Sequence, residues 1–597
     1  MNKFFLITTP IIETWDFNKN TLMLGDWCNT FEKKDNLNRL KQNKILDYHW
    51  KNTEKVFQDY IYLNNFAEKI LENLVKKLNI IHETNFSKEY WKIIVGNWLF
   101  SFTHIIYDRW ETIQKAFNEF EIDSTKIIEI KKNDVIPQSM ENFTELAHQD
   151  KWNHYIFSEI LKRNFKNSIK FEQITTLDND NYVRFNKDRT PLLKNLLFGA
   201  YKLSRNIYCK LFRDDRYFIS DSYIGKCNEI LLNLRLRNFP ISISPRSYLF
   251  IEPNHDLRKE LLIQMETKNK FEFFFLDILK DHIPCSFLEN YKVIRNSIKK
   301  SHWPKNPKVI FTSHAINTKT VSSFYIAKKK EDGAILIHGQ HGGGYGQCKF
   351  HWYEKFEKEI SDYYLSWGWS DDKKTIPFGM LKSIETLKRI KKNKKIRNKF
   401  LIVIRPKERY FSTALDSKIR GPQILDYHLN CIKMARGLKK DIKDKNLIIR
   451  LHERTYGWCE KEMWMNNLPN IDIDQGSKSI YKNISRSKLV VYTYNSTGYL
   501  ELMAANLPVL LYWSNTNNPV NSETESFFEE LKNAKIFHEN QDSLIEHVNK
   551  EWNDIDSWWF SEKVQSIRKK FCEKYAKFIE HKVDNLKNLI KECELKK

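Results

Sequence analysis

The sequence predicts an α/β fold in which two domains, each built on a parallel sheet, face one another across a cleft. Short apolar, β-branched segments alternate with segments of helical periodicity, once within residues 1–385 and again within residues 386–555. This alternation is typical of parallel sheets with helices on both faces. A basic run at 388–395 separates the two series. We therefore expect an N-terminal α/β domain over 1–385, a C-terminal α/β domain over 386–555 and a helical tail over 556–597.

Length and charge limit the possible functions. The chain has 597 residues, enough for two or three domains, and a net charge of +23 from 98 Lys and Arg against 75 Asp and Glu. Such a charge suits nucleic acid, an anionic membrane surface or simple solvation. No zinc-finger, RNA-binding or helix-turn-helix pattern accompanies it, so we expect no nucleic acid. The run at 388–395 is either a linker or a contact with anionic lipids.

The sequence predicts a cytoplasmic protein. It has no stretch of eighteen consecutive apolar residues, and its N-terminus lacks the long apolar core and cleavage site of a signal peptide. Nine scattered cysteines form no CxxC pair, which favours free thiols in a reducing compartment. A basic linker that touched lipids would place the protein peripherally on the inner face of the cytoplasmic membrane.

The first series opens with two short strands that are each followed by carboxylates. The strand at 4–8 precedes Glu13 and Asp16, and the strand at 21–24 precedes Asp26. Carboxylates that follow strands of a parallel sheet can face a cleft and act as a base or a nucleophile. The alternative is that they cap turns, which is the more common role of such residues.

A helix-rich stretch enlarges this domain. Helical periodicity runs through residues 52–120, 143–163, 191–211, 225–236 and, in pieces, 257–300. Asp178 and Asp180 within it resemble a carboxylate pair for a divalent metal, but such patterns are common by chance, and we expect no metal site.

A glycine- and histidine-rich motif follows the strand predicted at 334–337. The motif HGQHGGGYG contains His338 and His341, and its glycines, including Gly342 and Gly343, allow the backbone to turn sharply and approach a ligand. The histidines can donate to a phosphate or exchange a proton. The motif is neither a Walker loop nor a GxGxxG fingerprint. The alternative is a flexible turn with incidental histidines. Strands predicted at 308–314 and 362–368 complete this sheet.

The second series begins with a strand at 400–404 and a helix at 423–440. A strand at 446–451 then carries Arg450 near its end, with His452 directly after it. A strand-end histidine paired with a neighbouring carboxylate is the structural alternative for His452.

The segment 489–512 predicts a strand, a polar turn, a helix and a second strand. Asn495, Ser496, Thr497 and Gly498 lie in the turn at the start of the helix. The N-terminus of a helix presents unpaired N–H groups and a partial positive charge, so it can hold an anion. In open α/β sheets such loops lie where ligands bind. The alternative is that Ser496 or Thr497 only caps the helix. A last strand at 535–537 and a charged helical tail from 558 follow.

Four segments share one family resemblance. TTPIIETWDF with LGDWC, HGQHGGGYG, ISDYYLSWGW and YNSTGYLELMAANLPVLLYW resemble transferases from bacterial O-antigen and surface-polysaccharide gene clusters, over nearly the whole chain. More distantly, the layout is similar to that of GT-B glycosyltransferases that use CMP-activated keto sugars, such as Kdo- and sialyltransferases. The resemblance implies a GT-B-like fold of two Rossmann-like domains that face a cleft.

The resemblance also implies substrates and binding residues. It implies a CMP-sugar as donor substrate, with no separate cofactor, and a glycan or lipid-linked glycan as acceptor. In the similar enzymes a His-Pro motif and a Ser/Thr-rich loop hold the nucleotide phosphate. Arg450 and His452 match the first, although Glu453 stands where proline is expected, and Ser496 with Thr497 matches the second.

The chemistry of sugar transfer assigns the remaining roles. The enzyme must stabilise a departing phosphate and handle the acceptor proton. The predicted catalytic residues are His341, His338, Glu13, Asp16 and Asp26. The predicted binding residues are Arg450, His452, Asn495, Ser496, Thr497, Gly498, Gly342 and Gly343. The alternatives are a polyol-phosphate transferase of the teichoic-acid type and a non-catalytic protein that binds a nucleotide or a glycan.

Overall fold

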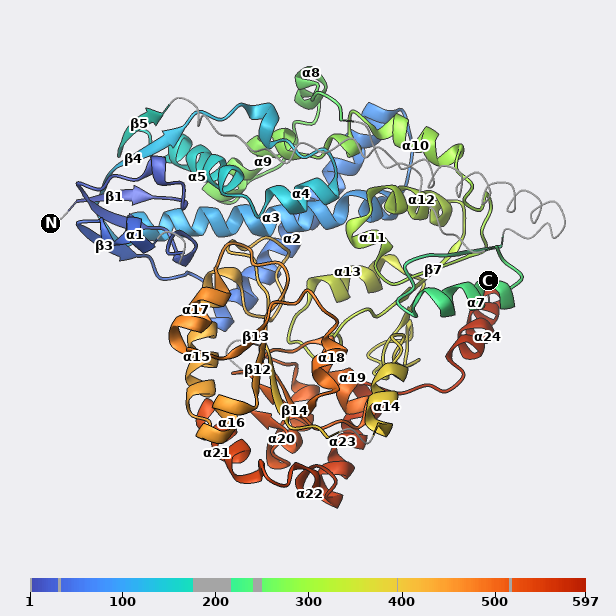
Figure 1. Ribbon diagram of the computed structural model, residues 1–597. Helices are drawn as coiled ribbons and strands as arrows, with labels where there is room; N and C mark the ends of the chain where they lie inside the picture. The colour runs from blue at the N-terminus through green and yellow to red at the C-terminus, as the bar shows by residue number, and fades with distance from the viewer. Residues whose placement is uncertain are drawn as a thin grey trace, which may run out of the picture.

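The structure is a computed structural model that describes residues 3–30, 34–174, 216–239, 250–393, 396–514 and 518–596. It contains three parallel sheets surrounded by helices (Figure 1). The predicted α/β, GT-B-like fold class is confirmed. The helix predicted at 191–211 and the pair Asp178 and Asp180 lie outside the described residues.

The first sheet has five strands in the order β3-β2-β1-β4-β5, and all neighbours are parallel. Its strands are β1 (Phe4–Ile7), β2 (Asn20–Met23), β3 (Gln42–Ile45), β4 (Ile122–Ile128) and β5 (Lys170–Ile174). Every residue of β1 is buried, as its run FFLI predicts. The sequence predicts β1 and β2 in one domain with the strands after residue 308, whereas in the structure they belong to a separate sheet.

Two long helices between β3 and β4 form the predicted enlargement. They are α2 (Thr53–His82) and α3 (Lys88–Glu119), capped by the side chains of Asn52 and Ser87, which accept hydrogen bonds from backbone N–H groups of the first turn. Most of α3 is buried, and it packs on α2, α5 and α12. It therefore joins the first sheet to the helices of the second. The remaining helices of this region are α1 (Lys34–Asn38), α4 (Met140–Leu146) and α5 (Asp150–Asn164).

The second sheet also has five parallel strands, in the order β10-β9-β8-β7-β6. Its strands are β6 (Tyr217–Ile219), β7 (Val309–Thr312), β8 (Ile335–Gly339), β9 (Tyr363–Leu365) and β10 (Thr375–Ile376). The helices between these strands are α7 (Lys226–Arg235), α8 (His255–Lys259), α9 (Lys270–His282), α10 (Tyr291–Lys299), α11 (Ala315–Thr318), α12 (Thr320–Glu331) and α13 (Trp352–Ile360).

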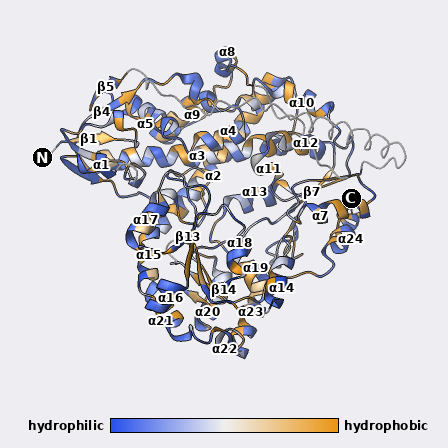
Figure 2. Ribbon diagram, in the orientation of Figure 1, coloured by the Kyte–Doolittle hydropathy of each residue, from blue (hydrophilic) through white to orange (hydrophobic). Residues whose placement is uncertain are grey.

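The third sheet has six parallel strands in the order β13-β12-β11-β14-β15-β16. The strand order reverses between β11 and β14, which makes this the switch point where open α/β sheets bind ligands. Its strands are β11 (Lys399–Val403), β12 (Leu447–Arg450), β13 (Asp472–Asp474), β14 (Ser487–Tyr492), β15 (Val509–Tyr512) and β16 (Phe537–His538). The apolar strands lie at the centre of this part of the molecule (Figure 2).

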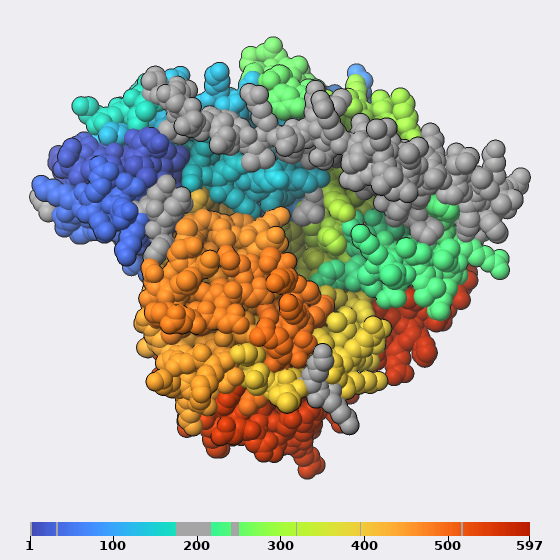
Figure 3. Space-filling model, viewed as in Figure 1, coloured from blue at the N-terminus to red at the C-terminus, as the bar shows by residue number. Residues whose placement is uncertain are grey.

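Helices cover both faces of the third sheet. They are α15 (Ile424–Arg436), α16 (Lys440–Lys445), α17 (Glu460–Asn467), α18 (Ile480–Ile484), α19 (Thr497–Ala505), α20 (Ser522–Asn533) and α21 (Gln541–Glu551). Part of the predicted basic linker is helical, because α14 spans Glu385–Lys392. The segment around the third sheet, in orange, packs directly against the N-terminal part of the chain, in blue and cyan (Figure 3).

The helical tail connects two sheets. After α22 (Ile555–Trp559), α23 (Glu562–Tyr575) packs on α19 beside the third sheet, whereas α24 (Lys582–Leu595) packs on α7 of the second (Figure 1). Within the described ranges, no helix is both long and apolar enough to cross a bilayer.

Candidate functional site

A cavity of about 610 Å³ lies at the switch point of the third sheet. The loops after β11, β12 and β14 line one side, and the glycine- and histidine-rich loop after β8 lines the other. The site is therefore a cleft between two sheets. Of the predicted site residues, it is lined by His341, Gly342, Gly343, Arg450, His452, Asn495, Ser496, Thr497 and Gly498.

The start of α19 presents free donors to this cavity. Ser496 is the N-cap residue, but its hydroxyl caps no backbone N–H and instead lies beside the Tyr494 hydroxyl. The capping alternative therefore does not account for Ser496. Gly498 is needed because a Cβ there would lie 2.1 Å from the Tyr492 hydroxyl oxygen. The first turn of α19 can thus hold an anion.

The glycine- and histidine-rich loop is held firmly against α19. The backbone N–H of Gly343 donates to the Thr497 hydroxyl at 3.1 Å. The Gln347 amide oxygen accepts hydrogen bonds from Asn495 Nδ2 at 3.1 Å and from the Tyr499 hydroxyl at 2.8 Å. These bonds order the loop, which the sequence left open as a flexible turn.

The two histidines of the motif have different positions. His338 lies at the end of β8, is fully buried and does not line the cavity. His341 lines the cavity with 24% of its side chain exposed. Burial lowers the pKa of His341 to about 3, and the nearby His314 and Lys418 act in the same direction. His341 is therefore neutral at physiological pH.

The long loop after β11 contributes cations that the sequence analysis did not select. Arg405, Lys407 and Lys418 line the cavity, and Lys418 Nζ donates to the Gly343 carbonyl at 3.3 Å. The guanidinium of Arg405 lies 5.7 Å from the centre of the Tyr494 ring. The signal was present in the sequence, since Arg405 directly follows a predicted strand of the second series.

Arg450 and His452 both line the cavity, but they differ in how many protein groups already hold their side chains. Arg450 forms an ion pair with Asp474, and its Nη2 donates to the Gly476 carbonyl at 3.1 Å, so part of its charge is already balanced. His452 is exposed, and its Nδ1 accepts a hydrogen bond from the Arg454 N–H at 3.0 Å. The alternative role of His452, a pairing with a neighbouring carboxylate, is not among its described hydrogen bonds.

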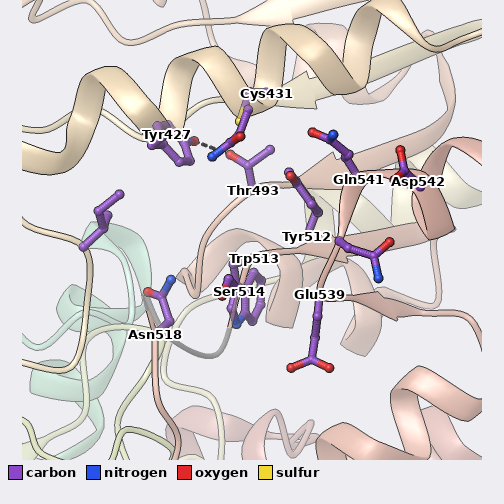
Figure 4. Close-up of a pocket in the computed structure, with 13 residues that line it drawn as sticks. Tyr427, Cys431, Thr493, Tyr512, Trp513, Ser514, Asn518, Glu539, Gln541 and Asp542 are labelled. Atoms are coloured by element: carbon purple, nitrogen blue, oxygen red, sulfur yellow. Dashed lines mark hydrogen bonds between the residues drawn. The ribbon is translucent and has the colours of Figure 1, made fainter. Parts of the chain in front are cut away.

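Tyr427 fixes the two loops that meet at the switch point. Its hydroxyl accepts a hydrogen bond from the Arg405 N–H at 2.8 Å and is also hydrogen-bonded to the Thr493 hydroxyl. The second bond is the dashed line in Figure 4. Tyr427 and Thr493 also line a smaller cavity of about 270 Å³ on the α15 side of β14.

The early carboxylates do not join this cavity. Glu13 is exposed, and Asp16 accepts a hydrogen bond from the Asn18 N–H at 3.0 Å, as expected for a turn cap. Asp26 begins a 3₁₀ turn, and burial, with the nearby Asp426 as a smaller cause, raises its pKa to about 6. None of the three lines the cavity. Their catalytic role stays a prediction.

Two tryptophans explain this placement. The indole N–H of Trp27 donates to the Thr8 carbonyl at 2.9 Å, and that of Trp15 donates to the Thr9 carbonyl at 3.0 Å. Thr8 and Thr9 directly follow β1, at the point where the strand order of the first sheet reverses. The motifs TTPIIETWDF and LGDWC therefore fill the position where this sheet would otherwise bind a ligand.

These features define a GT-B-like α/β protein with a cationic cleft suited to an anionic ligand. The chain belongs to the LIC12162 family of transferases, whose model matches residues 4–590. No curated protein matches the chain in sequence.

Several solved structures resemble the fold at low identity. The wall teichoic acid polymerase TagF is 11% identical, with a TM-score of 0.32 over 68% of this chain and 96% of that chain. MurG from Acinetobacter baumannii is 9% identical, with a TM-score of 0.31 over 79% and 99% of the two chains. HepE from Anabaena, in complex with UDP and glucose, is 11% identical, with a TM-score of 0.32 over 64% and 98%. This likeness is too weak to indicate an activity.

Proposed function

We propose that the protein is a glycosyltransferase that moves a nonulosonic acid or Kdo-like sugar from a CMP-activated donor to a surface-polysaccharide or O-antigen acceptor. The observation that carries the proposal is the Ser496 hydroxyl at the start of α19, which caps no backbone N–H and lines the same cavity as Arg405 and Lys418. Membership of a transferase family supports group transfer. The choice of CMP and of the sugar rests on the sequence resemblance.

The donor phosphate would bind on the side of the third sheet. The N–H groups of the first turn of α19, the Ser496 hydroxyl and the Arg405 guanidinium would each donate to phosphate oxygens. These groups are fixed before the reaction, so they can stabilise the charge that develops on the departing phosphate. Lys418 adds a further positive charge beside Gly343.

The acceptor would be activated from the side of the second sheet. His341 is neutral, faces the cavity and lies on the wall opposite the loop after β11. It can accept the proton of an acceptor hydroxyl as the new glycosidic bond forms. We accordingly propose that residues 386–555 bind the donor, that residues 1–385 admit the acceptor, and that residues 556–597 connect them.

A basic helix offers a contact with the membrane that carries a lipid-linked acceptor. Lys388, Arg389, Lys391 and Lys392 all lie on α14, where Leu387 is the buried residue. We propose that this helix meets anionic lipids on the inner face of the cytoplasmic membrane, because each exposed cation near such a surface contributes about 1 kcal/mol.

The experiment is a thermal-shift and calorimetric comparison of CMP, CDP, UDP, GDP and ADP, with the variants Ser496→Ala and Arg405→Ala. Selective stabilisation by CMP that both variants lose would support the donor site. Selective binding of CDP would favour a polyol-phosphate transferase, and that of UDP or GDP another sugar donor. No nucleotide binding would refute the proposal. Binding without transfer to any acceptor would leave a non-catalytic binding protein.

A further inference from the structure

A fully buried carboxyl group lies directly behind His341. Glu357 of α13 has no exposed surface, and its Oε1 accepts hydrogen bonds from Asn317 Nδ2 at 2.7 Å and from the Tyr345 hydroxyl at 3.1 Å. Its Oε2 lies 3.5 Å from the Tyr364 hydroxyl. An isolated charge is costly in such a place, so a buried carboxyl group with this many partners requires an explanation.

Each oxygen of this carboxyl group faces a histidine of the glycine-rich motif. Nδ1 of His341 is 3.6 Å from Oε1, and Nδ1 of His338 is 3.6 Å from Oε2. Neither Nδ1 makes a hydrogen bond of normal geometry in the part of the chain that the structure describes, although the Ser313 backbone also interacts with the His341 ring. A buried polar atom without a good partner is costly. A shift of a few tenths of an ångström would give the Nδ1 of His341 a partner in Glu357.

The second ring nitrogen of His341 lies on a different side. Its Nε2 is 3.4 Å from the Tyr345 hydroxyl. Of the two histidines in the motif, His341 lines the cavity and His338 does not, so Nε2 of His341 is the nitrogen that can contact a ligand. Nδ1 faces the protein interior. A histidine oriented in this way can act as a base through Nε2 only if its proton resides on Nδ1.

We infer that Glu357 is a positioning residue that holds His341 as the Nδ1–H tautomer and leaves Nε2 free to take the acceptor proton. This inference rests on the proposed function. In the step, the acceptor O–H bond breaks and its proton forms an N–H bond at Nε2. The freed electron pair forms the bond to the sugar carbon, and the bond from that carbon to the phosphate oxygen breaks, with its electrons remaining on the phosphate. The Nδ1 proton stays in place beside the Glu357 carboxyl oxygen, which accepts its hydrogen bond and so keeps the ring in this orientation.

Hydrogen-bond donors surround the Glu357 oxygen that faces His341. The amide nitrogen of Asn317 can only donate, and the Tyr345 hydroxyl donates to the same oxygen. Burial raises the pKa of Glu357 well above its usual range, and the hydrogen bonds from Asn317 and Tyr345 offset only part of that rise. Because Nδ1 faces the protein interior, a nucleotide in the cavity does not contact it. The protein groups around Nδ1 therefore determine the tautomer of His341.

The tautomer can be measured without any transfer activity. Full-length protein labelled with ¹⁵N-histidine is compared with Glu357→Gln by long-range ¹H–¹⁵N spectra, and the His341 signals are assigned by their loss in His341→Gln. We expect neutral His341 with its proton on Nδ1 in the wild type and a shift toward the Nε2–H form in Glu357→Gln. A proton on Nε2 in the wild type, or an unchanged tautomer in the variant, overturns the inference even if the protein proves to be a glycosyltransferase.

Kinetics give an independent readout. Glu357→Gln should lower kcat by about 100-fold or more and leave the Kd for CMP within about twofold, because the lost group acts on the proton and not on the donor. Glu357→Asp should recover part of kcat, and Tyr364→Phe, which removes only the long contact at Oε2, should change it little. If Glu357→Gln does not fold, Glu357→Asp carries the test, and wild-type kcat in that variant together with an unchanged tautomer overturns the inference. A wild-type protein that binds no nucleotide refutes the proposed function and leaves the tautomer result intact.

Discussion

The backbone N–H of Gly343 donates a hydrogen bond to the hydroxyl of Thr497 across 3.1 Å. Gly343 belongs to the loop after β8 of the second sheet, and Thr497 begins α19 of the third. This bond therefore joins the two sides of the candidate site. The contact is close because a Cβ on Gly343 would lie 2.3 Å from the Ser496 carbonyl carbon. Because Gly343 has no side chain, the loop after β8 can lie directly against the start of α19.

Replacing Gly343 should therefore separate the two loops. Gly343→Ala places a methyl group against backbone that cannot move aside, so we expect a destabilisation of about 1–3 kcal/mol and a loss of nucleotide affinity of about tenfold or more. Gly342→Ala is the matched control, because its Cβ would meet only side chains, at 3.6 and 3.8 Å. Thermal unfolding and calorimetry measure both effects. Equal behaviour of the two variants would contradict this account.

Ser496 should contribute to binding and not to stability. An N-cap serine usually stabilises its helix by about 1 kcal/mol, but this hydroxyl caps no N–H in the part of the chain that the structure describes. We expect Ser496→Ala to leave the melting temperature unchanged in the absence of ligand and to weaken nucleotide binding about tenfold. A lower melting temperature with unchanged affinity would show that Ser496 is an ordinary cap.

Local patterns in the sequence were sufficient to find the main elements of the site. The strand before HGQHGGGYG and the strand–turn–helix at 489–506 were predicted from residue type and periodicity, and both are present as β8 and as β14 with α19. Parallel strands also implied that Arg450, His452 and Ser496 would meet at one edge. These inferences need only neighbours along the chain.

Relationships across long separations were not predictable in this way. The first sheet is a separate one because β1 and β2 pair with β3, β4 and β5 and not with the strands after residue 308, and no local pattern shows which strands pair. Glu357 lies on α13, sixteen residues after His341, and only the packing of α13 on β8 and β9 brings its carboxyl group behind the motif. Asp26 follows a strand, which predicts a position in a cleft. The sequence does not show that the neighbouring Trp27 packs at the end of β1, where such a cleft would open.

The early carboxylates provide a test of that assignment. Asp26 does not line the cavity, and the indole of Trp27 fills the switch point of its sheet. We expect Asp26→Asn to change kcat by less than about threefold, whereas His341→Gln should lower it about 100-fold or more. Steady-state transfer assays of both variants check this. A large loss of kcat in Asp26→Asn, with nucleotide affinity unchanged, would support the catalytic role predicted from the sequence.

The raised pKa of Glu354 leads to a prediction of how the stability of the protein depends on pH. It lies on α13, and its carboxyl group accepts a hydrogen bond from the Gly346 N–H at 2.7 Å. Burial raises its pKa to about 7, against an ordinary value of 4.5. Between these two values the folded state binds the proton more tightly than the unfolded state, so the stabilisation is complete below pH 4.5 and is lost as the pH rises through 7.

Glu354→Gln removes this titration and keeps an oxygen that can accept the Gly346 N–H. We expect the variant and the wild type to have similar melting temperatures at pH 5. At pH 8 the variant should be more stable, by an amount on the order of 1–3 kcal/mol. At that pH the wild type has an ionised carboxylate in a buried position, which lowers its free energy of unfolding, whereas the glutamine is neutral. The matched control is Glu359→Gln on the same helix, whose side chain is exposed and forms an ion pair with Lys92, so it removes a carboxylate that is not buried. Thermal unfolding of all three proteins at the two pH values gives the comparison, and parallel pH profiles for wild type and Glu354→Gln would show that Glu354 ionises freely in the folded protein.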